Sequence, residues 1–354
     1  MRWQTAATVS SRRRRPRRPG RRQVALLGAV LAVVAVGALV PVLRGPNGPS
    51  PSPASADAPA AAAGPATPET TRSTAAAIPG LDGLAPVPAT SARPRASTAG
   101  KPAAPRPAVA SARKGASIWK SAGMAAALRD SGASWFYTWG ADSKGVTAPG
   151  VEFVPMIWGA ANADAATIAR AKAAGRTLLG FNEPDLAGQA TMSVDTALSL
   201  WPKLQATGLR LGAPAVAAGA DKAGGWLDEF MTGAAARGYR VDFVPLHWYG
   251  GDFRAGPATD QLKAYVSAVW ARYHKPIWIT EYALMRFDGG TKYPTAAVQS
   301  AFVGQSTAML RILSYVERYA WFSLATPDEG GDGTGLYRPD GTRTPAGDAY
   351  RAAS

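Results

Sequence analysis

Eight short apolar runs punctuate the chain between residues 114 and 354. Most of them are continuous stretches of hydrophobic side chains rather than alternations of apolar and polar positions. A continuous run is typical of a strand that is buried on both faces, as in a parallel sheet. The pattern therefore predicts strands at residues 115–119, 134–139, 153–158, 177–181, 210–216, 243–249, 276–282 and 319–324.

Segments with apolar residues at helical spacing separate several of these runs, and they predict helices at residues 160–174, 193–207, 259–273 and 295–316. Gly175, Gly208 and Gly238 stand where helices would end before the next strand. Strands that alternate with helices predict an α/β fold, and eight such units over about 250 residues favour a (β/α)8 TIM barrel. The alternative is a doubly wound open sheet. It is disfavoured because no glycine-rich GxGxxG loop follows the first strand.

The first third of the chain has a different pattern. Residues 1–23 are basic and include RRRRPRRPGRR at 12–22, and residues 24–43 form an uncharged run of 20. That length suits a signal anchor that spans a bilayer, whereas Ala54-Ser55-Ala56 offers a cleavage site for a secretion signal. Residues 44–113 are rich in Pro, Ala and Ser, which predicts a disordered linker. We therefore expect residues 114–354 to form an extracytoplasmic catalytic domain, either membrane-anchored or secreted.

Charge and residue composition exclude several functions. The chain has a net charge of +15, of which +13 lies in residues 1–113 and only +2 in residues 114–354, so a nucleic-acid-binding face on the folded part is not supported. There is no cysteine, which excludes disulfides, thiolate metal sites and cysteine nucleophiles. The two histidines, His247 and His274, are too few for a zinc site built on several histidines. We expect neither a metal nor another cofactor, and a monomeric domain.

The positions of the acidic residues relative to the predicted strands distinguish catalytic candidates from the others. In a TIM barrel, catalytic groups lie at the C-terminal ends of the strands. Glu152 and Asp242 precede their strands and are expected on the opposite, stabilising end. Glu183 and Asp185 follow the fourth run, and Glu281 ends the seventh. Glu183 and Glu281 are therefore the candidate catalytic pair.

Two carboxyl groups facing one substrate are what glycosidic cleavage requires. One protonates the leaving oxygen, and the other either attacks the anomeric carbon or activates water. A separation of roughly 5–5.5 Å predicts retention of configuration and about 6.5–9.5 Å predicts inversion. The sequence leaves this choice open.

Aromatic side chains gather at the same predicted strand ends. Flat aromatic rings pack against the C–H faces of sugars, so we expect a substrate-binding platform rather than ordinary core packing, although either is possible for any single residue. His247 can equally be a core histidine, orient a glutamate or bind a hydroxyl. The candidate aromatic residues are Trp139, Trp158, Trp248, Tyr249, Tyr282 and Trp321.

Five ordered motifs in the folded part resemble glycoside hydrolase family 128, a member of the clan of retaining (β/α)8 glycosidases. The motifs are SWFYTWG at 134–140, FVPMIWG at 153–159, LGFNEPD at 179–185, VDFVPLHWYG at 241–250 and WITEYA at 278–283. The resemblance covers about residues 114–354. The Asn-Glu-Pro triplet alone is moderately specific, whereas the ordered set is much more so.

The resemblance implies cleavage of β-1,3-glucan by a retaining double displacement. It implies Glu183 as the acid/base, Glu281 as the nucleophile and Asn182 as a hydrogen-bond partner of the 2-hydroxyl of the reacting sugar. It further implies that Trp158, His247, Tyr249 and Trp321 shape the subsites. Two alternatives remain. One is a membrane-tethered protein that binds or senses glucan without cleaving it, and the other is a hydrolase or transglycosylase that acts on another β-glycan.

Overall fold

The computed structural model describes residues 111–119, 121–327 and 331–353. Each predicted apolar run overlaps one strand. The strands are β1 (Lys114–Ser117), β2 (Trp135–Tyr137), β3 (Glu152–Phe153), β4 (Thr177–Leu178), β5 (Arg210–Leu211), β6 (Val244–Gly250), β7 (Ile277–Leu284) and β8 (Val316–Trp321). All of their pairings are parallel, which confirms the predicted parallel α/β sheet.

The sheet is not one continuous ladder. Six strands pair in the order β3-β2-β1-β8-β7-β6, and β4 and β5 form a separate pair. Only isolated parallel bridges cross the two gaps, Met156 with Leu179 and Gly212 with Phe243. The expectation of a closed eight-stranded barrel is therefore corrected to a parallel sheet in two sections. The strands next to the gaps are short, with two residues each in β3, β4 and β5, so they offer few ladder hydrogen bonds.

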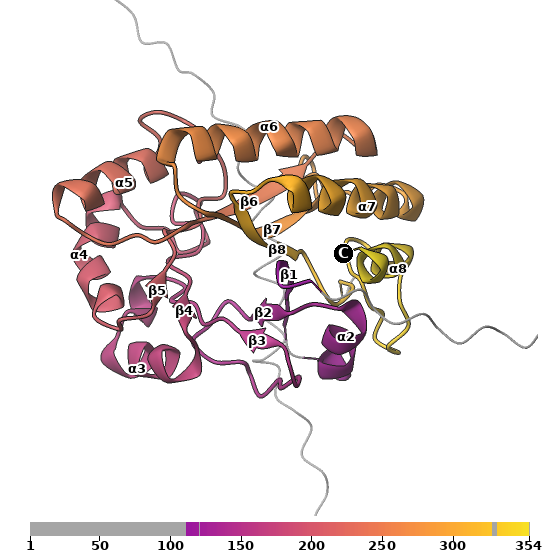
Figure 1. The fold of residues 1–354 in the computed structure, drawn as a ribbon, viewed down its shortest axis with the longest axis horizontal. Helices are drawn as coiled ribbons and strands as arrows, with labels where there is room; N and C mark the ends of the chain where they lie inside the picture. Colours follow the sequence, from indigo (N-terminus) through magenta and orange to yellow (C-terminus); the bar gives the residue numbers. More distant parts are fainter. Residues whose placement is uncertain (1–110, 120, 328–330, 354) are drawn as a thin grey trace, which may run out of the picture. The chain divides into compact units, whose positions relative to one another are not determined.

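Helices lie outside the strands (Figure 1). They are α2 (Met124–Ser131), a 3-10 turn η2 (Ala160–Asn162), α3 (Ala165–Ala174), α4 (Val194–Gln205), α5 (Trp226–Ala236), α6 (Ala255–Tyr273), α7 (Ala296–Ile312) and α8 (Pro345–Ala352). Side-chain caps from Asp164, Ser193 and Thr295 begin α3, α4 and α7 by accepting backbone N–H groups. The predicted helix at 295–316 was too long, because Val316 pairs with Ile277 as the first residue of β8.

The interior between the strands is packed with side chains from the strands and from the residues that closely adjoin them. The ring of Trp278 in this cluster has its centroid 4.3 Å from that of Phe243 and 5.2 Å from that of Trp135. The Arg318 guanidinium lies 4.4 Å from the ring centroid of Trp278 and pairs with Glu152 at 2.6 Å. Glu152, at the start of β3, thus stabilises the N-terminal end of the sheet, and the C-terminal end is left for the chemistry.

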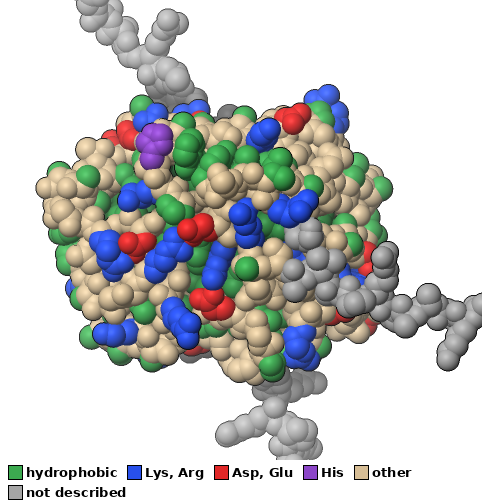
Figure 2. Space-filling model, in the orientation of Figure 1, with side chains coloured by type: hydrophobic (Ala, Val, Ile, Leu, Met, Phe, Trp, Pro, Cys, Tyr) green, Lys and Arg blue, Asp and Glu red, His purple; other side chains and the backbone are tan. Residues whose placement is uncertain are grey.

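Charged side chains of both signs lie side by side on the face drawn in Figure 2, and no large area of one sign is seen there. This agrees with the small net charge of residues 114–354. Asp242, just before β6, accepts the backbone N–H of Leu211 at 2.7 Å and pairs with Arg240. Among the described residues, no helix combines the length and the apolar character needed to cross a bilayer. The segments predicted at 1–23 and 24–43, and nearly all of the linker at 44–113, lie outside the described residues.

Candidate active site

Glu183 is held just beyond the end of β4 by the backbone of its neighbours. Its N–H donates to the carbonyl of Ala215 at 2.7 Å, and the N–H of Asn182 donates to the carbonyl of Trp158 at 2.9 Å. Glu183 has a φ of 45°, in the left-handed region that side chains other than glycine seldom adopt. Such conformations cost roughly 1–3 kcal/mol and cluster at functional sites.

Glu281 lies inside β7, and the parallel pairing of β6 with β7 sets His247 directly beside it. An irregularity of register between Leu246 and His247 precedes this pair. The sheet therefore places the imidazole next to one carboxylate, and the end of β4 brings the other carboxylate to it.

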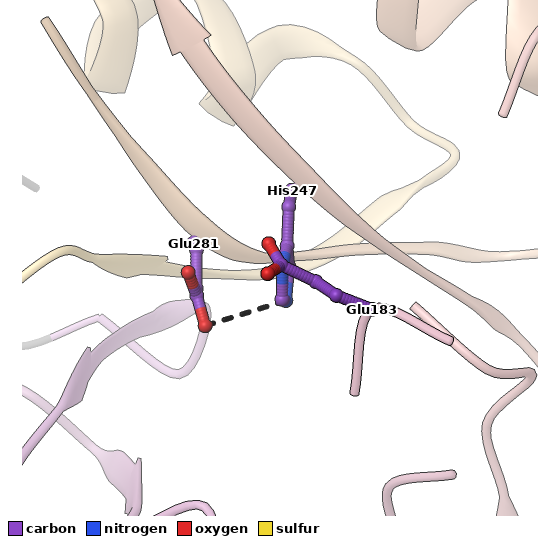
Figure 3. A group of neighbouring side chains, drawn as sticks. All are labelled: Glu183, His247 and Glu281. Carbon is purple, nitrogen blue, oxygen red and sulfur yellow. Dashed lines mark hydrogen bonds and ion pairs between the residues drawn. The ribbon is translucent and has the colours of Figure 1, made fainter. Parts of the chain in front are cut away.

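The imidazole of His247 bridges the two carboxylates, as Figure 3 shows. Its Nδ1 lies 2.8 Å from Glu183 Oε1, and its Nε2 lies 3.5 Å from Glu281 Oε1. The longer contact is an ion-pair distance and does not satisfy Nε2 as a hydrogen bond. One carboxylate oxygen from each glutamate and one imidazole nitrogen all lie within 4.8 Å of one another. Glu183 and Glu281 are 6% and 5% exposed, so both carboxylates are largely shielded from bulk water.

Three donors from β2 and β6 hold Glu281 in place. Trp139 donates its indole N–H to Oε1 at 2.7 Å, and the Tyr137 hydroxyl donates to the same oxygen at 3.1 Å. Tyr249 donates its hydroxyl to Oε2. Burial and the charge of Glu281 raise the pKa of Tyr137 and of Tyr249 well above 10, so both hydroxyls remain protonated donors.

Burial raises the pKa of Glu183 above its usual range, and the negative charge of Glu281 adds to the effect. The hydrogen bond and charge of His247 offset part of this rise. Burial alone would lower the pKa of His247, but the carboxylates of Glu281 and Glu183 raise it above its ordinary value. Glu183 therefore keeps its proton to a higher pH than an exposed glutamate does.

Asn182 lies beside the pair with an unused acceptor. Its side chain is 3% exposed, and its Nδ2 donates to Gln189 Oε1 at 3.3 Å. Its Oδ1 has no hydrogen-bond partner within the described structure. The site therefore has a free amide oxygen that can accept a hydroxyl of a ligand.

An aromatic rim lies next to the carboxylates. The rings of Trp119 and Trp139 stack with centroids 6.0 Å apart. Phe322 meets Trp139 at 6.0 Å and Tyr249 at 5.5 Å, and Phe287 meets Tyr249 at 5.5 Å. Sequence reasoning found Trp139 and Tyr249 but missed the other three residues, as well as Tyr137 inside β2. Trp119 and Phe322 follow β1 and β8, and only the strand order β2-β1-β8 shows that their ends adjoin.

The remaining predicted aromatic residues lie elsewhere. Trp158 is partly buried and packs against the interior cluster near Asn182. Trp248 stacks on Phe302 of α7, with centroids 5.8 Å apart. Tyr282 and Trp321 are both 0% exposed and meet at 5.0 Å. These last three pack between the sheet and the helices, which corrects their expected place in the substrate platform.

Glu183, His247 and Glu281 also form a set of donors that can bind a divalent cation. Several of these atoms already have partners: His247 Nδ1 contacts Glu183, and both oxygens of Glu281 accept hydrogen bonds from Tyr137, Trp139 and Tyr249. A cation would have to compete with these contacts. The same arrangement as it stands provides one carboxyl group with a raised pKa, a second carboxyl group held by three hydrogen-bond donors, and a buried imidazole between them.

Comparisons with known proteins identify the family of the chain. Residues 115–350 match the family model described as "Glycosyl hydrolase catalytic core". A crystal structure of a subgroup I endo-β-1,3-glucanase of glycoside hydrolase family 128 from Amycolatopsis mediterranei is similar to the chain. It has 62% identity and a TM-score of 0.66, and the match covers 69% of this chain and 100% of that one. The bacterial enzyme was crystallised with laminaripentaose.

More distant proteins extend the comparison. A subgroup II endo-β-1,3-glucanase of the same family from Sorangium cellulosum is 30% identical with a TM-score of 0.57, over 68% of this chain and 98% of that one. "Alkali-sensitive linkage protein 1" of Schizosaccharomyces pombe is 34% identical over 207 residues, which are 55% of this chain. The chain spans only 35% of the length of that yeast protein.

Proposed function

Because the chain belongs to glycoside hydrolase family 128, we propose that it hydrolyses β-1,3-glucan with retention of configuration, with Glu183 as acid/base and Glu281 as nucleophile. The substrate is supported by the similar enzymes, which are endo-β-1,3-glucanases solved with laminari-oligosaccharides. Two of those structures contain variants in which one glutamate, a different one in each, is replaced by alanine.

The close approach of the two carboxylates carries the proposal. One oxygen of each carboxylate lies within 4.8 Å of one oxygen of the other, which is closer to the roughly 5–5.5 Å of retaining enzymes than to the about 6.5–9.5 Å that leaves room for an attacking water. A direct attack by Glu281 fits this spacing better than a water-mediated one.

In the first step, Glu281 forms a bond to the anomeric carbon while the glycosidic bond breaks. Oε1 of Glu281 already accepts from Trp139 and Tyr137, so Oε2, which accepts only from Tyr249, is the attacking oxygen. Glu183 gives its proton to the departing glycosidic oxygen. The raised pKa of Glu183 keeps that proton available.

In the second step, water attacks the anomeric carbon of the glycosyl-enzyme and the ester to Glu281 breaks. Glu183, now a carboxylate, takes the proton from water and regains its starting state. The 2.8 Å contact with His247 Nδ1 stabilises this carboxylate between the two steps. The free Oδ1 of Asn182 is available for the 2-hydroxyl of the reacting sugar.

The domain is proposed to act outside the cytoplasm as a monomer. Support comes from the basic segment at 1–23 and the apolar run at 24–43, which would anchor it or be cleaved after export. A linker at 44–113 would let the domain work at a distance from the membrane.

Hydrolysis of laminarin by the purified protein tests the proposal. We expect new reducing ends from laminarin and far fewer from β-1,4-linked glucan. Proton NMR recorded during the first minutes should show the β-anomer of the product before mutarotation. The α-anomer would refute retention. If the folded protein bound laminarihexaose without releasing products, the non-catalytic alternative would replace the hydrolase, and cleavage of another β-glycan alone would change the substrate.

A further inference from the structure

A second cavity lies on the outside of the fold, between α4 and α5. Figure 1 shows these helices next to each other in the outer layer. The cavity has a volume of about 690 Å³, within the roughly 300–1,000 Å³ that small-molecule sites occupy. We call it the α4–α5 groove and define it by Ser193, Asp195, Trp226, Glu229, Thr232 and Arg237.

Trp226 presents a fixed aromatic surface in this groove. Its indole N–H donates to the carbonyl of Met192 at 2.9 Å, and its ring stacks on Phe230 at 5.7 Å with an interplanar angle of 11°. Both contacts hold the ring in one orientation while it lines the cavity. A rigid ring loses little entropy when a sugar packs on it.

Apart from Asp228, which accepts from Gly224 and Arg272, several polar groups of the groove have unused hydrogen-bonding capacity. Asp195 and Glu229 are exposed and make no hydrogen bond or ion pair with another side chain in the described part of the chain. Within the described residues, the one hydrogen bond that the Arg237 side chain donates goes to the carbonyl of Gly233, at 3.0 Å. Thr232 adds an exposed hydroxyl. Carboxylates accept hydroxyl protons, and a guanidinium donates to hydroxyl oxygens, so this set matches a neutral polyol.

The groove is continuous in sequence with the catalytic loop. Ser193 caps α4 at the end of the segment that begins with Glu183, and Met192 of this segment accepts the Trp226 indole. Neither glutamate of the site nor any aromatic residue of its rim lines the groove. It is therefore a separate surface reached by a long chain rather than an extension of the catalytic pocket.

We propose that the α4–α5 groove binds a second segment of the β-1,3-glucan chain and thereby holds the enzyme on insoluble substrate. This inference rests on the proposed function. The aromatic floor favours a glucan as the occupant, because aromatic rings pack against the C–H faces of sugars. A polymer occupies the catalytic pocket and a distant groove together, so the effect should appear only with long substrates.

The test compares variants of the full chain on soluble and insoluble substrate. Trp226→Ala removes the aromatic floor, and Thr232→Arg fills the groove from an exposed position without touching the core. Trp270→Ala is the matched control, because that ring is 37% exposed and lies on α6. Binding to insoluble β-1,3-glucan is measured by depletion in a Glu281→Gln background, and kcat/KM on laminaripentaose is measured with Glu281 intact.

We expect both groove variants to weaken binding to insoluble glucan about fivefold or more. Their kcat/KM on laminaripentaose should stay within about twofold of wild type, and Trp270→Ala should change neither. The inference would be overturned if binding to insoluble glucan were unchanged, or if binding to insoluble glucan and kcat/KM on laminaripentaose fell equally. It would also be overturned if oligolysine saturated the groove and left glucan binding unchanged. If the wild-type protein does not cleave laminaripentaose, the proposed function fails independently of these binding results.

Discussion

Replacing Glu183 by glutamine should separate the two proposed carboxylate roles. The amide keeps the size of the side chain and can still accept from His247 Nδ1, which lies 2.8 Å from Oε1, but it cannot give or take the catalytic proton. General acid–base catalysis contributes about 10²–10⁴-fold in rate, or about 2.7–5.5 kcal/mol of activation free energy. Glu183 is 6% exposed, so bulk water is a poor substitute. We therefore expect kcat/KM on laminaripentaose to fall by about 10³-fold or more.

The assay uses two substrates with the same sugar and different leaving groups. The dinitrophenolate of a 2,4-dinitrophenyl laminaribioside leaves without needing a proton. The rate of the first step with this substrate should therefore remain within about tenfold of wild type in Glu183→Gln. The second step still needs a base, and added azide should replace water and give a β-glycosyl azide. Glu281→Gln is the control, because without the nucleophile neither the activated leaving group nor azide should restore turnover by this route.

Two outcomes would refute this assignment. If azide restores Glu281→Gln with a β-azide product while Glu183→Gln stays inactive on the activated substrate, the two roles are reversed. If either variant keeps wild-type activity on laminaripentaose, the residue concerned does not carry out the chemistry. Thermal unfolding of both variants should match wild type, which rules out loss of fold as the cause.

Three further predictions concern charge and burial. His247→Phe removes the hydrogen bond and charge that lower the pKa of Glu183. Glu183 should then stay protonated to higher pH, so the alkaline limb of the kcat/KM profile should move to higher pH. An alkaline limb that stays in place or moves to lower pH contradicts this. Tyr319→Phe removes a buried hydroxyl that has no partner in the described structure. The unfolding free energy should therefore stay unchanged or rise by about 1 kcal/mol. A decrease of more than about 1 kcal/mol in urea titration would contradict this prediction. Burial, with a smaller effect of Arg351, lowers the pKa of Lys114 to about 8, so the folded state binds fewer protons than the unfolded state at higher pH. Relative to Lys114→Met, wild type should gain about 2–3 kcal/mol of stability between pH 8 and pH 10.5, and a flat difference would refute the reasoning.

Strand positions were predictable because burial on both faces leaves a continuous apolar run. The β1, β6 and β7 segments each lie within or overlap the predicted runs, and the long helices α4, α6 and α7 follow their apolar spacing. The short helices were not predicted as such. α2 (Met124–Ser131) and α8 (Pro345–Ala352) have eight residues each, too few for a clear period. The two interruptions of the sheet were not predicted either, because they depend on β3, β4 and β5 being only two residues long.

Both glutamates could be chosen from the sequence because one rule, the position of catalytic groups at C-terminal strand ends, orders the acidic residues along the chain. Their approach to within 4.8 Å could not, because it depends on where the β4 end lies relative to β7. The role of His247 was left open for the same reason. Only the pairing of β6 with β7 shows that it lies beside Glu281 rather than in a separate part of the core.

Strand alternation explains which aromatic residues reach the site and which do not. Successive side chains of a strand point to opposite faces. On β2, Trp135 and Tyr137 belong to the interior cluster and Trp139, two positions on, packs against it, which points the last two toward Glu281. On β7, Glu281 faces the pocket, so Tyr282 must face the helices, where it lies against Phe302. A tryptophan or tyrosine next to a catalytic residue in a strand is therefore evidence for the opposite face. The aromatic residues that bind substrate are to be sought two positions away or on the neighbouring strand end.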